Sequence, residues 1–161
     1  MMARWIRAGR MAPLDFDETC VRLAVAQPPQ ASPILLWAQS AERFPFALIV
    51  PLRMAPGRRN RWAAWGLASA VAAYRQFGVP AYLDHDEIWL GGRAIAETVA
   101  EAIGESVVVA SAFIAQFPGS CVPTPSGALE QAFRLRLEAQ HGWQFEHSWP
   151  TRPEMVDVAH A

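Results

Sequence analysis

Apolar residues along the chain follow helical spacing in some stretches and form short continuous runs in others. Bulky apolar residues recur every three or four positions over 61–77, and Gly78 with Pro80 then provides a strong stop signal. The same spacing recurs over 128–140, and a shorter helix is expected over 18–26, before a proline pair. The pattern therefore predicts three helices.

Runs of strand-forming residues fill the intervals between these helices. The β-branched run over 106–117 predicts a central strand that is buried on both faces. Two short strands flank the acidic loop at 84–87, and Gly91 with Gly92 predicts a hairpin turn before the apolar return over 93–103. Other strands are expected at 33–39, 46–53 and 143–149, followed by a loosely ordered tail over 150–161. This order predicts an α+β fold with a mixed or antiparallel central sheet and flanking helices.

Composition predicts a single domain and limits the classes of partner that the protein could bind. The 161 residues, 52% of them hydrophobic, suit a single domain over 1–161. A net charge of −1 lacks the basic excess of a nucleic-acid binder, and no apolar run is long enough to span a membrane. Cys20 and Cys121 show no zinc-ligand spacing, so no metal site is expected and a reduced cytoplasm is the expected location.

Several motifs in the first two thirds of the chain follow one another in a familiar order. "AQSAER" at 38–43 is similar to "EQTAGRGR", "LDHDEI" at 83–88 to "KWPNDI", and "VVVASAFIA" at 107–115 to "VVVGIGINV". In this order, residues 34–117 resemble the catalytic domain of the biotin and lipoate protein ligase family. The resemblance implies the fold of that domain and a ligand site formed by Gln39, Arg43, Asp86, Glu87, Gly92 and Arg93.

Other positions depart from the family pattern. The lysine that approaches the ligand carboxylate and the phosphate falls on Leu83, and the second lysine falls on Ala94. Alanines at 110 and 112 replace two glycines of the last motif. Because phosphates need cations and free backbone N–H groups, these changes disfavour ATP, whereas biotin, lipoate or octanoate remains a possible ligand. The resemblance therefore implies a degenerate member with the hairpin kept as a scaffold; the alternative is an acidic surface turn without a ligand.

Two residues are candidates for catalysis, each with a structural alternative. His85 between two acids could act as a general base, but neighbouring residues of an extended segment point to opposite faces, so a solvated loop histidine is the alternative. Cys121 could be the nucleophile of an acyl or cofactor transferase that uses an activated donor, because octanoyl transferases of the same superfamily use a loop cysteine. The alternative is a packing cysteine.

The sequence leaves three functional hypotheses open. The first is a non-catalytic or altered domain that binds a small carboxylic ligand or its carrier protein. The second is the transferase, and the third is a structural subunit that forms a homodimer through exposed strand edges or tryptophans. For the carrier, the resemblance points to an acidic protein that contacts the basic residues around the start of the 61–77 helix, namely Arg53, Arg58, Arg59 and Arg61. The alternative is a loop whose charges only keep the protein soluble.

Overall fold

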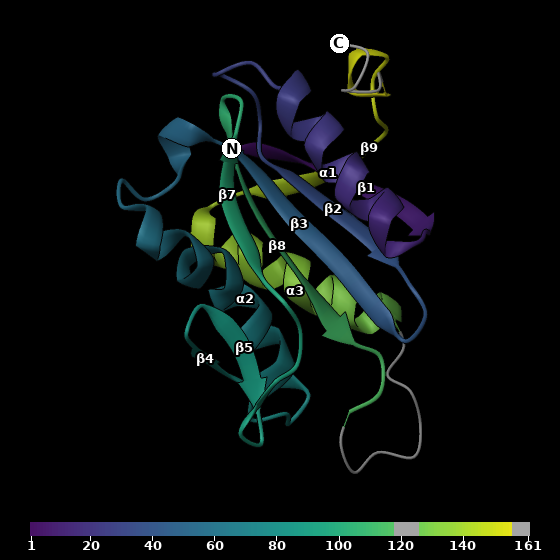
Figure 1. The fold of residues 1–161 in the computed structure, drawn as a ribbon, viewed down its shortest axis with the longest axis vertical. Coiled ribbons are helices and arrows are strands. Elements are labelled where there is room, and N and C mark those ends of the chain that lie inside the picture. The colour runs from purple at the N-terminus through teal and green to yellow at the C-terminus, as the bar shows by residue number, and fades with distance from the viewer. Residues whose placement is uncertain (118–125, 156–161) are drawn as a thin grey trace.

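A mixed six-stranded sheet forms the centre of the molecule. The computed structural model describes residues 1–117 and 126–155. Within them the sheet order is β7-β8-β3-β2-β1-β9 (Figure 1), in which β1 runs parallel to β2 and to β9 and the other neighbours are antiparallel. Its strands are β1 (Met2–Arg10), β2 (Ile34–Gln39), β3 (Arg43–Pro51), β7 (Val99–Ile103), β8 (Ser106–Ile114) and β9 (Gln144–Ser148). The predicted α+β fold with a mixed sheet is confirmed.

A second, small sheet consists of two consecutive hairpins. Its strands are β4 (Tyr82–Asp84), β5 (Glu87–Leu90) and β6 (Arg93–Ala94). Gly91 and Gly92 connect β5 to β6 with φ values of 61° and 79°, a left-handed conformation that glycine adopts without steric cost. The predicted glycine hairpin is therefore confirmed.

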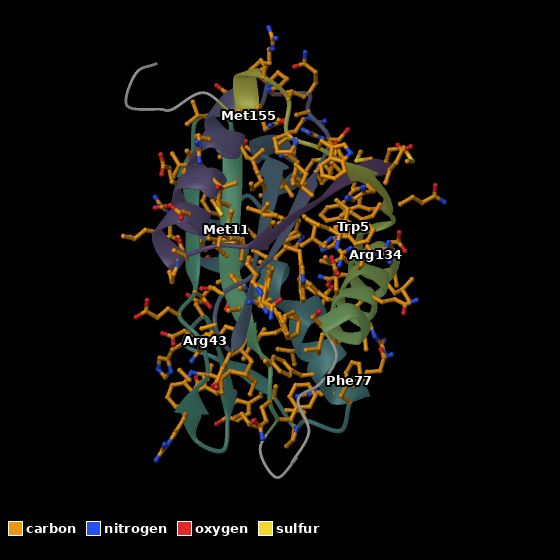
Figure 2. The ribbon with its side chains drawn as sticks, turned by 90° about the vertical axis from the view of Figure 1, so that its right-hand side faces the viewer. Trp5, Met11, Arg43, Phe77, Arg134 and Met155 are labelled. Atoms are coloured by element: carbon orange, nitrogen blue, oxygen red, sulfur yellow. The ribbon has the colours of Figure 1, made fainter. Side chains whose placement is uncertain are left out.

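Three α-helices cover the two faces of the large sheet. Helix α1 (Pro13–Ala26) packs on one face, whereas α2 (Trp62–Gln76) and α3 (Ser126–His141) pack on the other, and Figure 2 shows α1 and α3 on opposite sides of the sheet. The alternation of β2 explains these layers, because Ile34 and Leu36 belong to the α1 core and Leu35 to the larger core under α2 and α3. Short 3-10 helices lie at Leu52–Met54 (η1), Arg59–Arg61 (η2) and Pro153–Met155 (η3).

Several predicted boundaries were wrong. The first helix begins at Pro13 rather than at residue 18, because proline fits the first helical turn, where its missing N–H has no partner to lose. The helix predicted over 61–77 spans Trp62–Gln76, and Arg61 is its N-cap without a side-chain hydrogen bond. The apolar return over 93–103 is two separate strands, β6 and β7. The sequence analysis missed β1 altogether.

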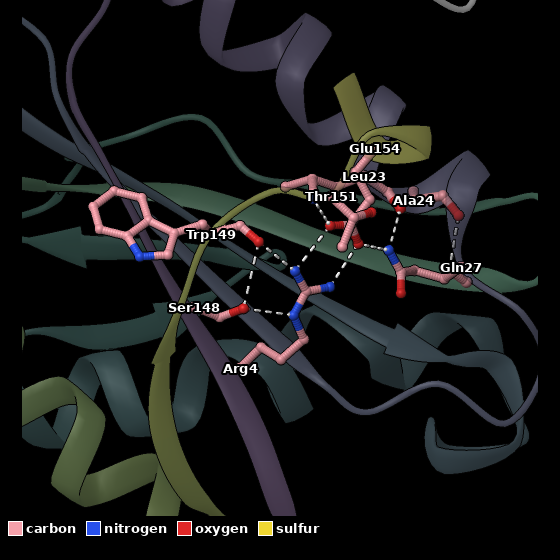
Figure 3. Close-up of polar contacts among 9 residues, drawn as sticks. Arg4, Leu23, Ala24, Gln27, Ser148, Trp149, Thr151 and Glu154 are labelled. Atoms are coloured by element: carbon pink, nitrogen blue, oxygen red, sulfur yellow. Dashed lines mark hydrogen bonds and ion pairs between the residues drawn. The ribbon is translucent and has the colours of Figure 1, made fainter. Parts of the chain in front are cut away.

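The C-terminal segment before residue 156 is anchored to the sheet, although a loose tail from residue 150 was expected. Glu154 is 5% exposed and forms an ion pair with Arg4 of β1 at 2.6 Å. Its carboxylate also accepts hydrogen bonds from Gln27, the C-cap residue of α1, and from the backbone N–H of Thr151 (Figure 3). In the part of the chain that the structure describes, no helix has the length and hydropathy needed to cross a membrane.

Candidate ligand-binding site

The acidic loop at 84–87 forms a tight two-residue turn. His85 and Asp86 both have positive φ, 49° and 62°, as a type I′ hairpin connection requires, so that Asp84 faces Glu87 across the hairpin. His85 Nδ1 lies 2.9 Å from Asp84 Oδ1, and the His85 side chain is 82% exposed. The predicted histidine therefore contacts one carboxylate at a solvent-exposed tip.

A cavity of ≈ 570 Å³ lies between α1, the large sheet and the small sheet. Volumes of this size are common for small-molecule sites. The N-terminal part of α1 forms one wall, the segment from β6 to β7 forms another, and β3 and β8 form the floor. Most of the lining is apolar: Pro13, Phe16, Pro45, Ala94, Ile95, Ala96, Val99, Ala110 and Ala112. The cavity therefore suits an aliphatic or ring body.

Arg43 is the basic residue among those that line the cavity. It begins β3, and its Nη1 donates a hydrogen bond to the carbonyl oxygen of Ile95 at 2.5 Å, across the cavity wall. Figure 2 labels its position on the α1 side of the molecule. Among the described residues, no carboxylate lies within ion-pair distance of Arg43. Its remaining donors are therefore available to a ligand anion.

Three carboxylates line the same cavity. Asp17 comes from α1, Glu87 from β5 and Glu97 from the segment between β6 and β7, so one arginine and three acids give the lining a formal charge of −2. ATP, which the ligase resemblance implies, needs an excess of positive charge around its phosphates. The described lining does not fit ATP.

Ser111, a residue of the cavity lining that carries a hydroxyl group, was missed by the sequence analysis. Ser111 of β8 lines the cavity, is 6% exposed and accepts a hydrogen bond from the Thr98 hydroxyl at 3.3 Å. The only signal in the sequence is a serine within the run "VVVASAF", where the pattern otherwise predicts apolar residues. Asp17 was also missed as a site residue, because α1 reaches the cavity from a distant part of the chain.

The structure separates the six residues that the resemblance assigned to one site. Arg43 and Glu87 line the main cavity. Gln39, at the end of β2, lines a neighbouring cleft of ≈ 360 Å³, and Asp86 lines another of ≈ 480 Å³ beside Arg59 and Asn60. Gly92 and Arg93 are exposed in the β5–β6 hairpin.

The two positions at which the resemblance implies lysine, Leu83 and Ala94, lie in different surroundings in this structure. Leu83 lies in β4 opposite Ile88 and packs against the large core. Ala94 lines the main cavity, so its methyl group stands where the resemblance places the second lysine.

The predicted basic surface lies between β3 and α2. Arg53 is in η1, where its Nε donates to the carbonyl oxygen of Pro29 at 3.2 Å. Arg59 lies over the ring of Trp62 at 5.6 Å, and all four arginines are exposed. The four arginines of the predicted basic surface are Arg53, Arg58, Arg59 and Arg61.

The described residues offer no reactive thiol or metal centre. Cys20 is buried in α1, and burial raises the pKa of its thiol to about 12, which removes the reactive thiolate at neutral pH. Cys121 lies outside the described residues, so its role stays a prediction. No three histidine, cysteine, aspartate or glutamate side chains in the described part of the chain are placed to hold a metal ion.

Comparison with known proteins establishes the fold. No family model and no curated protein sequence matches this chain. A bi-partite lipoate protein ligase from Thermoplasma acidophilum superimposes with a TM-score of 0.79 at 8% identity, over 96% of this chain and 89% of that one. A lipoate-protein ligase A bound with ATP gives 0.77 at 10% identity, over 96% and 91%.

Biotin protein ligases share the same architecture at lower similarity. The enzyme from Aquifex aeolicus gives a TM-score of 0.63 at 12% identity, over 88% of this chain and 70% of that one. The resemblance read from the motifs is therefore confirmed at the level of the fold: the chain has the fold of the biotin and lipoate protein ligase catalytic domain.

Proposed function

We propose that this protein is an altered ligase-like domain that binds a small carboxylic acid with an aliphatic or ring body and does not activate it with ATP. The cavity between α1 and the sheet carries the proposal, because it combines apolar walls with one arginine, Arg43, that has no ion-pair partner among the described residues. A buried apolar body and a single anchored anion are what such a lining accommodates.

Proteins of the same fold support a carboxylic ligand. A Thermoplasma acidophilum protein of this fold, with a TM-score of 0.79 and 9% identity, holds bound lipoic acid. The Plasmodium falciparum protein LipL1, with a TM-score of 0.67 and 5% identity, was solved in complex with lipoate. Lipoate, octanoate and biotin are therefore the acids to test first.

The lining opposes the nucleotide that a ligase would use. A triphosphate in the cavity would meet Asp17, Glu87 and Glu97, and Arg43 alone cannot offset their charge. We therefore propose binding without adenylate formation.

A carrier protein is the proposed partner. The Thermoplasma ligase belongs to a lipoylation system that includes its E2 lipoyl domain. In this chain, the exposed arginines at 53, 58, 59 and 61 form a basic surface that suits an acidic carrier. Neutralising Arg58 and Arg61 together should weaken carrier binding and reduce its salt dependence.

Calorimetric titration with octanoate and lipoate tests the ligand. Arg43→Gln should weaken octanoate binding about five- to tenfold, and Arg43→Lys should restore part of the loss, because lysine keeps the charge but not the forked donors. Arg136→Gln, on the exposed face of α3, is the matched control. No binding of either acid, or equal binding by Arg43→Gln, would refute the proposal.

Native mass spectrometry of the same samples tests the other hypotheses. A covalent acyl adduct that is lost in Cys121→Ser would favour the transferase, and a dimer mass would favour the homodimer. The cytoplasmic location likewise stays a prediction from cysteine usage.

A further inference from the structure

The cavity is open at one end of its floor and closed at the other. Along the face of β3 that points to α1, Arg43 is exposed, Pro45 is half-buried and Ala47 is 0% exposed. Arg43 and Pro45 line the cavity, whereas Ala47 belongs to the buried core under α1. The cavity therefore opens at Arg43 and ends where this core begins.

Strand β8 shows the same change from exposed to buried. Its residues Ala112 and Ala110 lie opposite Pro45 and Ala47, are half-buried and line the cavity. Val108, the next residue on that face of β8, is buried in the α1 core and lies outside the cavity lining. Both strands of the floor thus place the closed end at the same level of the sheet.

Phe16 of α1 lies at this closed end. Its side chain lines the cavity, is 4% exposed and belongs to the same buried core as Ala47 and Val108. Cys20, about one helical turn further along α1, is also buried in that core but does not line the cavity. Phe16 therefore forms the boundary between the cavity and the core.

We propose that Phe16 limits the length of the acid, so that the ligand is a linear medium-chain acid with its carboxylate at Arg43 and its last carbons against the Phe16 ring. This inference rests on the proposed function, because it assumes a carboxylic ligand in the same cavity. From Arg43 to Ala47 the floor extends about 13 Å at the usual rise per strand residue, which suits an extended medium-chain acid. A long-chain acid would need space that the Phe16 ring and the packed core behind it occupy.

Calorimetric titration with hexanoate, octanoate, decanoate, dodecanoate and hexadecanoate tests this limit. Each added methylene should tighten binding about fourfold while the chain still lies within the apolar cavity, because that methylene leaves water. In the wild type this gain should end at decanoate, and dodecanoate should bind no more tightly. Phe16→Val should move the end of the gain to a longer acid and tighten dodecanoate binding about tenfold relative to octanoate.

Phe133→Val is the matched control. Phe133 of α3 is buried in the core on the other face of the sheet, so the variant removes the same atoms and leaves the cavity lining unchanged. It should lower the thermal stability and leave the dependence of affinity on chain length as in the wild type. Phe16→Leu removes fewer atoms and should shift the limit in the same direction, so it replaces Phe16→Val if thermal unfolding shows that variant to be unfolded.

The outcomes separate this inference from the proposed function. A gain in affinity that ends at a medium-chain acid in the wild type and at a longer acid only in the Phe16 variant supports both. A gain that continues to hexadecanoate in the wild type, or that ends at the same acid in the Phe16 variant, overturns the role of Phe16 and leaves the carboxylic ligand in place. Failure of every acid to bind overturns the proposed function, and the inference with it.

Discussion

The anchor of the C-terminal segment should make the stability of this protein depend on pH through one carboxyl group, that of Glu154. Burial alone would raise its pKa, but hydrogen bonds from Arg4, from the Thr151 N–H and from Gln27, together with the Arg4 charge, lower the pKa to about 2. The bonds from Arg4 have lengths of 2.6 and 2.8 Å (Figure 3). Glu154→Gln removes the charge and keeps the shape.

The size of the effect follows from the difference between the folded and unfolded pKa values. A fall from 4.5 to about 2 corresponds to an upper limit of about 3.4 kcal/mol. Because the folded pKa is the lower one, this stability is fully present above the unfolded value and is lost as the pH falls toward 2. By the same relation, about 1.4 kcal/mol should remain at pH 3.

Urea unfolding of wild type and Glu154→Gln at pH 7, 5, 4 and 3 measures this dependence. The variant should be less stable by about 2–3 kcal/mol at pH 7, and the difference should shrink by roughly half at pH 3. Glu105→Gln, at an exposed turn, is the control and should change stability little at any of these pH values. A difference that is the same at pH 7 and pH 3 would refute the assignment of the stability to Glu154 ionisation.

Three further predictions concern packing and buried groups. Gly66→Ala should destabilise the protein by roughly 1–3 kcal/mol in thermal unfolding, because a Cβ there would lie 2.6 Å from Val109 Cγ1, and Val109→Ala should relieve part of the loss. Cys20 should react with a thiol reagent at pH 8 only when the protein unfolds, since burial raises its pKa to about 12. Burial lowers the pKa of His141, so stability should fall as the pH drops below about 6.5, and His141→Phe should remove this component.

Local signals in the sequence predicted the hairpins and the central parts of the helices. The sequence analysis missed features that depend on contacts between residues far apart in the chain. The Gly91–Gly92 turn follows from backbone freedom at two neighbouring residues. In contrast, β1 carries Arg4 and Arg7 at positions where a central strand is normally apolar. Their partners, Glu154 and Glu130, lie more than a hundred residues away and neutralise them in the fold. No local pattern could reveal that compensation.

The same distinction between local signals and long-range contacts applies to the residues of the candidate site. The order of the motifs led to Arg43 and Glu87, which the structure brings to one cavity from β3 and β5. The motifs could not lead to Asp17, because α1 precedes the region of resemblance and meets the cavity only after the sheet has formed. They grouped Gln39 and Asp86 with Arg43, although the chain directs those two side chains to other clefts.

The floor of the cavity carries alanine, Ala110 and Ala112, at the two positions where the resemblance to the ligase family implies glycine. Ala110 lies in register between Ala47 of β3 and Val99 of β7, so the ladder occupies its backbone groups and the cavity receives its methyl group. A phosphate placed there would meet carbon on the floor and carboxylates on the walls. Any transfer reaction at this site would therefore require an acyl group that had been activated elsewhere.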